Sequence, residues 1–198
     1  MGRWEPGASG RFRQAAMDLY LERGFDQTTV ADIAARAGLT SRTFFRYYAD
    51  KREVLFDGSE TLRSAMVEAV DRTPASAAPM RAVAAALDAA ATMLGERRDF
   101  ARRRQAVIDA NAELRERELA KMASLAGALA DGLRRRGVDE PDASLAAEAG
   151  IAVMRVAFAR WVGDDETRDL TAVVRESLTQ LGAITSRGGR RRASGASR

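Results

Sequence analysis

The spacing of its apolar residues constrains this chain more than any other feature. Apolar side chains recur three and four positions apart along most of the sequence, as they do on the buried face of a helix. No segment alternates apolar and polar residues for long, and β-branched residues are sparse, so strand patterns are almost absent. The chain of 198 residues is therefore predicted to be all-α, with room for one small module and one larger core.

Caps and helix breakers divide the predicted helices into three parts. Residues 1–49 are expected to form a small domain, residues 50–185 a larger helical domain, and residues 186–198 a disordered arginine-rich tail. A long fourth helix is expected from about 51 to 70. The small domain is expected to hold three helices, at about 9–23, 30–37 and 41–47.

The chain contains no cysteine and no histidine. Their absence excludes disulfides, thiolate or histidine-ligated metal sites, and catalytic pairs or triads built on either residue. No glycine-rich phosphate loop is present to support carboxylate or lysine chemistry. We therefore expect no metal, no cofactor and no enzyme activity, since an enzyme would need a buried carboxylate or lysine with a shifted pKa.

Charge and hydropathy bear on location and partners. No apolar run approaches the ~18–20 residues that span a membrane, and the N-terminus has no apolar signal segment, so a cytoplasmic protein is predicted. Five arginines after residue 186 dominate the formal net charge, which would fall from +4 to −1 without them. The pI near 10.1 is thus poor support for DNA binding. The tail is interpreted as a solvated end, with salt-sensitive DNA affinity as the alternative.

The segment from Thr28 to Tyr48 has the pattern of a helix-turn-helix. Two short helices are joined by a tight turn, in which a glycine is followed by an apolar plug. The second helix has one apolar face for docking and one polar face suited to a DNA major groove. The predicted core of this unit consists of Ile33, Ala34, Gly38, Leu39, Phe44 and Tyr48.

The same segment closely resembles the signature of the tetracycline-repressor (TetR) family. The matching stretches are TTVADIA at 28–34, AGLT at 37–40 and TFFRYY at 43–48, and the similarity extends over about residues 11–56. The resemblance implies a homodimeric transcription factor, usually a repressor, with an N-terminal DNA-binding domain and a C-terminal ligand-binding and dimerisation domain. Each third helix would enter one half-site of a palindromic operator, and a ligand in the C-terminal domain would weaken DNA binding.

The resemblance also implies roles for single positions. The residues expected to read bases are Ser41, Arg42 and Arg46. The residues expected to contact phosphates are Thr28 or Thr29, Thr43, Tyr47 and Lys51.

Two positions of the third helix depart from the family pattern. Arg42 replaces a residue that is often glycine, and arginine suits the O6 and N7 atoms of guanine. Phe45 replaces a frequent tyrosine and loses one phosphate hydrogen bond, which leaves contact with a thymine methyl as an alternative. The rival interpretation is that Arg42 and Arg46 are idle surface residues and that Thr29 is only a helix cap.

The larger domain is expected to bind a small apolar or acyl-like effector of unknown identity. Eight apolar residues at helical spacings are candidates to line its pocket: Met66, Met93, Phe100, Ile108, Met122, Met154, Phe158 and Trp161. Most apolar residues there must simply fill the core. The alternative is a DNA-binding regulator whose C-terminal domain binds a protein partner and no small molecule.

Two further features bear on the effector. A dense basic run contains Arg97, Arg98, Arg102, Arg103 and Arg104. It is interpreted as a solvated helix face, with a portal that attracts an anionic ligand as the alternative. The stretch from 96 to 119 resembles regulators of the mycofactocin system, whose ligands are fatty acyl-CoA esters.

The last two predicted helices offer a surface for homodimerisation. Their small and apolar residues would allow two helices from each subunit to form a bundle. Packing within one chain is the alternative. The residues assigned to the interface are Ala149, Ala152, Val156, Val174, Leu178 and Leu181.

Overall fold

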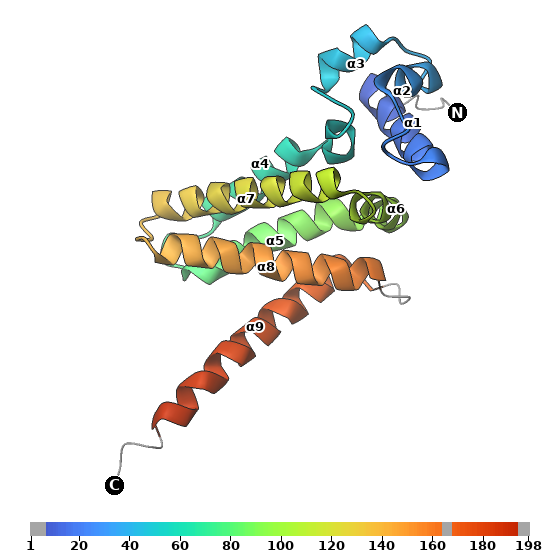
Figure 1. Ribbon diagram of the computed structural model, residues 1–198. Coiled ribbons are helices and arrows are strands. Elements are labelled where there is room, and N and C mark those ends of the chain that lie inside the picture. The colour runs from blue at the N-terminus through green and yellow to red at the C-terminus, as the bar shows by residue number, and fades with distance from the viewer. Residues whose placement is uncertain (1–6, 164–167, 194–198) are drawn as a thin grey trace, which may run out of the picture. The chain divides into compact units, whose positions relative to one another are not determined.

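The computed structural model describes residues 7–163 and 168–193, with side chains as far as residue 186. These described residues form nine α-helices, one 3₁₀ helix and no strand, which confirms the all-α prediction (Figure 1). The elements are α1 (Ala8–Arg23), α2 (Val30–Arg36), α3 (Ser41–Tyr47), η1 (Glu53–Phe56), α4 (Ser59–Arg72), α5 (Pro79–Gly95), α6 (Arg98–Asp109), α7 (Ala112–Arg135), α8 (Asp142–Gly163) and α9 (Leu170–Ala193).

Two compact units divide the chain at places that differ from the expected boundary near residue 50. The first, here termed the head, comprises the described residues up to Glu60 together with Asp99–Lys121. The second, termed the body, comprises Thr61–Arg98 and the described residues from Met122 onward. Most of α6 and the first part of α7 thus belong with the head, although the sequence analysis assigned them to the larger domain.

A shared apolar core explains why residues 99–121 belong with the head. Phe12 of α1 and Phe44 of α3 are fully buried and meet edge to face, with ring centroids 5.2 Å apart. Val107 and Ile108 of α6 and Leu114 of α7 are buried in the same core. Removing apolar surface from water is the main force that holds such elements together, so α6 completes the head.

The predicted start of the long fourth helix, at about residue 51, is wrong. The chain first forms the short helix η1. The Asp50 carboxylate just before it accepts from the N–H of Arg52 at 2.8 Å. Val54, Leu55 and Phe56 are all buried, and three consecutive residues cannot share one face of an α-helix. Gly58 then takes a φ of +88°, which ends this segment before α4 begins.

A largely buried arginine fastens α6 to η1. Nε of Arg104 donates to the carbonyl oxygen of Leu55 at 2.6 Å, and its guanidinium lies 5.0 Å from the centre of the Phe56 ring. Burial lowers the pKa of Arg104, and the carboxylate of Glu118, 3.3 Å away, opposes that shift. The partners therefore compensate for the cost of removing the charge from water.

In the body, α5, α8 and α9 pack against one another. Leu87 of α5, Ile151 of α8 and Leu170 of α9 are buried among them. The second half of α9 projects past α5 and α8 (Figure 1), and its residues 182–186 are exposed. The helix continues to Ala193, so residues 186–193 are helical where disorder was predicted, in keeping with the absence of proline from this stretch. The rest of the predicted tail, 194–198, lies outside the described residues.

The backbones of α5 and α8 approach each other closely at Gly150. A Cβ atom at this position would lie 2.4 Å from Cγ1 of Val83, far inside van der Waals contact. Val83 is fully buried and β-branched, so its side chain has few ways to turn aside. Any larger residue at position 150 would force the two helices apart.

We predict that Gly150→Ala lowers the free energy of unfolding by about 1–3 kcal/mol, because overpacking outweighs the gain in helix propensity. Gly127→Ala in α7 is the matched control, since a Cβ there would meet nothing within 4 Å. This control is expected to raise the free energy of unfolding by up to about 1 kcal/mol. Denaturant titration measures both values. A Gly150→Ala protein more stable than the wild type would contradict the close approach.

Candidate nucleic-acid interface

Reciprocal hydrogen bonds fix the start of α2. The hydroxyl of Thr29 accepts from the N–H of Asp32 at 3.1 Å, and the N–H of Thr29 donates to the Asp32 carboxylate at 2.9 Å. The Thr29 hydroxyl also donates to the Asp32 carboxylate at 2.6 Å. This bond, the bond from the Thr29 N–H and an ion pair to Arg23 at 2.7 Å together lower the pKa of Asp32 to about 2. The capping box therefore remains charged and intact at neutral pH.

The turn between α2 and α3 requires its glycine. Gly38 has a φ of +65°, a conformation that side-chain-bearing residues rarely adopt. The N–H of Leu39 then donates to the carbonyl oxygen of Ala34 at 2.9 Å, which closes the turn. The hydroxyl of Thr40 accepts from the N–H of Thr43 at 3.1 Å and so caps α3.

The inner face of α2 and α3 carries the residues assigned to the core. Ile33, Ala34, Phe44 and Tyr48 are buried, and Leu39 is half-buried. The hydroxyl of Tyr48 lies 3.0 Å from the hydroxyl of Ser9, which ties the end of α3 to α1. These contacts fix the direction in which the outer face of α3 points.

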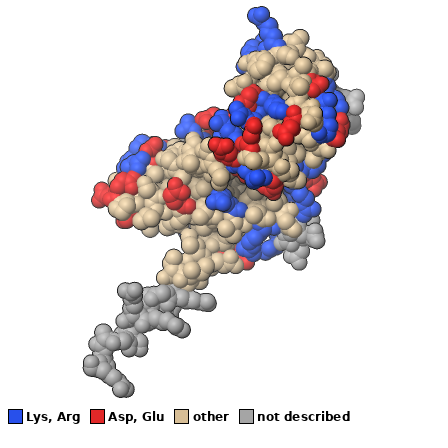
Figure 2. Space-filling view, viewed as in Figure 1, with Lys and Arg blue, Asp and Glu red and all other residues tan. Residues whose placement is uncertain are grey.

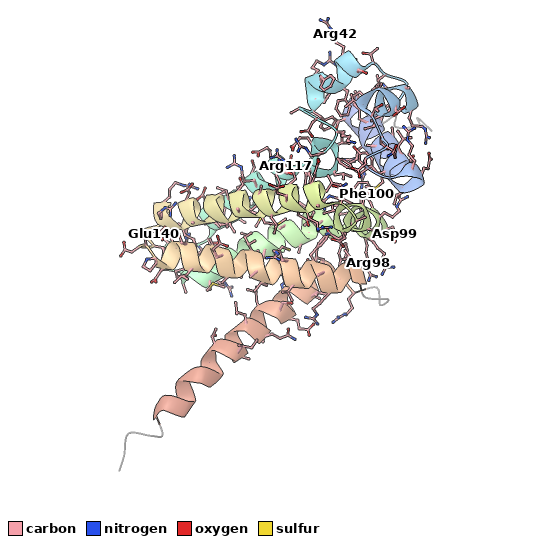
Figure 3. All side chains as sticks on the ribbon, in the orientation of Figure 1. Arg42, Arg98, Asp99, Phe100, Arg117 and Glu140 are labelled. Atoms are coloured by element: carbon pink, nitrogen blue, oxygen red, sulfur yellow. The ribbon has the colours of Figure 1, made fainter. Side chains whose placement is uncertain are left out.

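The outer face of α3 carries Arg42, Phe45, Arg46 and Tyr47, all exposed, while Ser41 is half-buried. Figure 3 shows Arg42 pointing away from the helix into open space. Within the part of the chain that the structure describes, neither Arg42 nor Arg46 has a carboxylate partner. Such uncompensated guanidinium groups are suited to binding an anionic partner.

Two of the expected phosphate contacts need correction. The side chain of Thr28 is fully buried, and its hydroxyl donates to the carbonyl oxygen of Gly24 at 2.8 Å, so it cannot reach a phosphate. The ammonium of Lys51 donates to the carbonyl oxygens of Phe25 at 2.8 Å and Thr28 at 3.0 Å. Lys51 therefore serves to hold the loop between α1 and α2. No local pattern revealed either contact, because the partners are distant in sequence or lie in a loop.

The eight candidates for an effector pocket are divided between the two units. Phe100 and Ile108 lie in the head, where Ile108 is fully buried in the core and Phe100 stacks under the guanidinium of Arg13 at 5.9 Å. Contacts within the head thus explain the positions of these two residues, and neither is assigned to an effector pocket in the body. The other six lie in the body, and they range from buried to exposed: Met66, Met93, Met122, Met154, Phe158 and Trp161.

The head contains a half-open cavity of about 260 Å³ that the sequence did not suggest. It lies between the loop after α1, with Phe25 and Asp26, and the end of α6, with Val107. The amide of Asn111 donates to the carboxylate of Asp26 at 3.1 Å and closes one side. This cavity is separate from the outer face of α3.

The residues assigned to dimerisation also differ in exposure. Ala152 and Val156 are exposed on α8, with Val156 exposing 55% of its surface. Val174 is fully buried within the body and is therefore removed from the set of predicted interface residues. The remaining members are partly exposed: Ala149, Leu178 and Leu181. In Figure 2 the part of α9 with described side chains, up to Ser186, shows largely uncharged surface where it leaves the rest of the body.

Two searches of the described residues gave no further site. No cluster of three or more carboxylates that could hold a metal ion occurs in 7–163 or 168–193. None of the described helices is long and apolar enough to cross a membrane.

Two family models match the chain. The model of bacterial regulatory proteins of the tetR family matches residues 12–57, and the model of the MftR C-terminal domain matches residues 77–186, more than half of the chain. The transcriptional regulator TcmR of Streptomyces glaucescens is 36% identical over 84 residues, which are 42% of this chain and 36% of TcmR. An uncharacterised regulator of Bacillus subtilis, YdeS, is 36% identical over 70 residues, which are 35% of this chain and 32% of YdeS. The matched segments thus span only about a third of these two relatives.

Solved structures share the fold over most of the chain. The FadR repressor of Thermus thermophilus, in complex with lauroyl-CoA, is 27% identical with a TM-score of 0.55, covering 87% of this chain and 92% of FadR. The Bacillus subtilis FadR, in complex with stearoyl-CoA, is 23% identical with a TM-score of 0.58, covering 87% of this chain and 96% of that FadR. At this identity the similarity supports the fold only. With a capped helix-turn-helix in the head and family models that match both ends of the fold, the chain belongs to the TetR family of transcriptional regulators.

Proposed function

We propose that the protein is a ligand-responsive repressor that binds a palindromic DNA operator as a homodimer in the cytoplasm. The observation that carries the proposal is the outer face of α3. It presents Arg42 and Arg46, without carboxylate partners among the described residues, on a helix whose inner face is fixed in the head core. An exposed helix of this kind fits a major groove, where arginine binds guanine through O6 and N7.

Phosphate contacts would position this helix on the duplex. Thr29, Thr43 and Tyr47 lie near the ends of α2 and α3 with exposed or half-buried side chains. The Tyr47 hydroxyl has no hydrogen-bond partner within the described part of the chain, so it is available to a phosphate oxygen. Thr28 and Lys51 are left out of this set for the reasons given above.

Selection from a library of randomised duplexes tests the proposal. The wild type should enrich an inverted repeat, because two heads related by a twofold axis bind two half-sites. Arg42→Ala should lose the preference for one base pair in each half-site, worth about 1–3 kcal/mol of discrimination. Arg103→Ala, which removes an exposed arginine from α6, is the matched control and should leave the selected sequence unchanged. An Arg42→Ala protein with the wild-type preference would refute the base-reading role.

The Lys51→Ala variant distinguishes a structural role of this lysine from a contact with a DNA phosphate. We predict that Lys51→Ala lowers the free energy of unfolding by about 1–3 kcal/mol, because the carbonyls of the α1–α2 loop lose their donor. The slope of log affinity against log salt should stay the same. A slope that becomes shallower by about 1.8 would instead mean that each of the two subunits had lost one phosphate contact, at about 0.9 per contact. Thermal or chemical denaturation and salt-dependent DNA titrations of the same variant supply the two measurements.

The homodimer is proposed to form through α8 and α9. Ala152 and Val156 leave small and apolar surface uncovered on α8, and Leu178 and Leu181 do so in part on α9. Helices with such faces associate readily into a four-helix bundle. Single half-sites in the selection would contradict a dimer that binds with both heads.

The effector is proposed to be an acyl-CoA thioester or a similar acyl anion. Similarity to a FadR solved with lauroyl-CoA supports this class, as does the resemblance of residues 96–119 described in the sequence analysis. Within the basic run, Arg98 and Arg104 are held by the carbonyls of Trp161 and Leu55, whereas Arg97 and Arg103 are exposed and would raise the local concentration of an anion.

We predict that lauroyl-CoA weakens binding to the selected duplex by about 5- to 150-fold, the usual extent of allosteric coupling. Fluorescence anisotropy of the labelled duplex measures the change, and a thermal shift without DNA measures binding itself. Coenzyme A and dodecanoate are the controls that separate the contributions of the two halves of the thioester. If none of the three compounds shifts either readout, the acyl-CoA class is refuted, which favours the alternative of a C-terminal domain that binds a protein partner.

A further inference from the structure

One apolar ring interrupts the polar outer face of α3. Phe45 exposes 59% of its surface, more than the 45% of the neighbouring Tyr47. A helix turns by about 100° per residue, so Arg42, Phe45 and Arg46 lie on one face at positions i, i+3 and i+4. The ring therefore lies on the same face of α3 as the two arginines assigned to base reading.

The Phe45 ring packs against an aromatic residue of the head core. It meets the buried ring of Phe44 edge to face, with centroids 5.6 Å apart and planes at 85°. Phe44 in turn packs on Phe12. The exposed ring thus has a preferred position before any partner binds, so binding costs little side-chain entropy.

The chemistry of the ring limits what it can recognise. Phenylalanine has no donor or acceptor, so Phe45 cannot hydrogen-bond a phosphate or the polar edge of a base. Tyr47 differs, since its hydroxyl is available for a phosphate. In the major groove the apolar group that a base pair presents is the C5-methyl of thymine, and 5-methylcytosine carries the same group.

We infer that Phe45 is a specificity-determining residue that packs on the C5-methyl group of a pyrimidine, in the first place thymine, next to a guanine read by Arg42 or Arg46. The inference rests on the proposed function. It adds a preference that hydrogen bonds from α3 cannot supply, because the presence of a methyl group changes apolar contact and leaves base pairing unaltered.

The test replaces the thymines of the selected duplex, one symmetric pair at a time, with deoxyuridine. Uracil pairs as thymine does but lacks the methyl group. For the wild type, each replaced thymine at the sensitive position should weaken binding by about fourfold, the effect of one buried methyl group, and the two replacements of a symmetric pair should multiply. 5-Bromodeoxyuridine at the same place should restore affinity, since bromine fills the space of the methyl. For Phe45→Ala, thymine and uracil duplexes should bind equally well.

Matched variants exclude a merely structural effect. Phe45→Leu keeps an apolar side chain and should retain part of the preference for thymine, and melting temperatures check that Phe45→Ala is folded. The wild-type comparison of thymine, uracil and bromouracil needs no variant. The inference is overturned if no thymine is sensitive, or if uracil costs the same in wild type and Phe45→Ala. With 5-methylcytosine, a gain over cytosine at that position identifies the methyl as the recognised group. Failure to enrich any duplex would overturn the proposed function, and this inference with it.

Discussion

The contact between Phe44 and Phe12 is the one on which the rest of the head depends. α3 spans only Ser41–Tyr47, and a helix of two turns is not stable by itself in water. Burial of Phe44 against α1 supplies the missing stability and also sets the rotation of α3 about its axis. Every residue on the outer face therefore takes its direction from a ring on the inner face. The capping bonds at Thr29 and Thr40 define where the helices begin, but they do not orient them.

Local chemistry made the helix-turn-helix predictable. A threonine cap, a positive-φ glycine and an apolar spacing of three and four all act within a few residues, so the bounds of α3 in the structure coincide with those read from the sequence. The family resemblance added the roles of the outer face. It also identified Arg42 and Phe45 as the two positions of α3 that depart from the family pattern.

Tertiary contacts explain where sequence reasoning stopped. The partners of Lys51 are carbonyls more than 20 positions earlier, and the long side chain reaches them only because the fold of the head brings Lys51 beside that loop. In the sequence alone, the three consecutive apolar residues of η1 fit the start of a long α-helix as well as a separate short helix. Only their common burial in the structure distinguishes the two. Likewise, Ile108 looked like a pocket residue because apolar spacing does not reveal which core a helix joins. Exposure of Val156 and burial of Val174 separate two residues that sequence placed together.

The course of α7 has an evolutionary consequence. This helix runs without interruption from Ala112 to Arg135, and its first part belongs to the head while its second part belongs to the body. Inserting or deleting a single residue near Lys121 would shift the buried residues of its second part, such as Leu129, by about 100° around the helix relative to those of its first part, such as Leu114. The segment between α4 and α5, by contrast, is a loop in which a change of length costs little. Among descendants of this chain, the length of α7 should thus be inherited more strictly than its sequence, whereas the loop is free to grow or shrink.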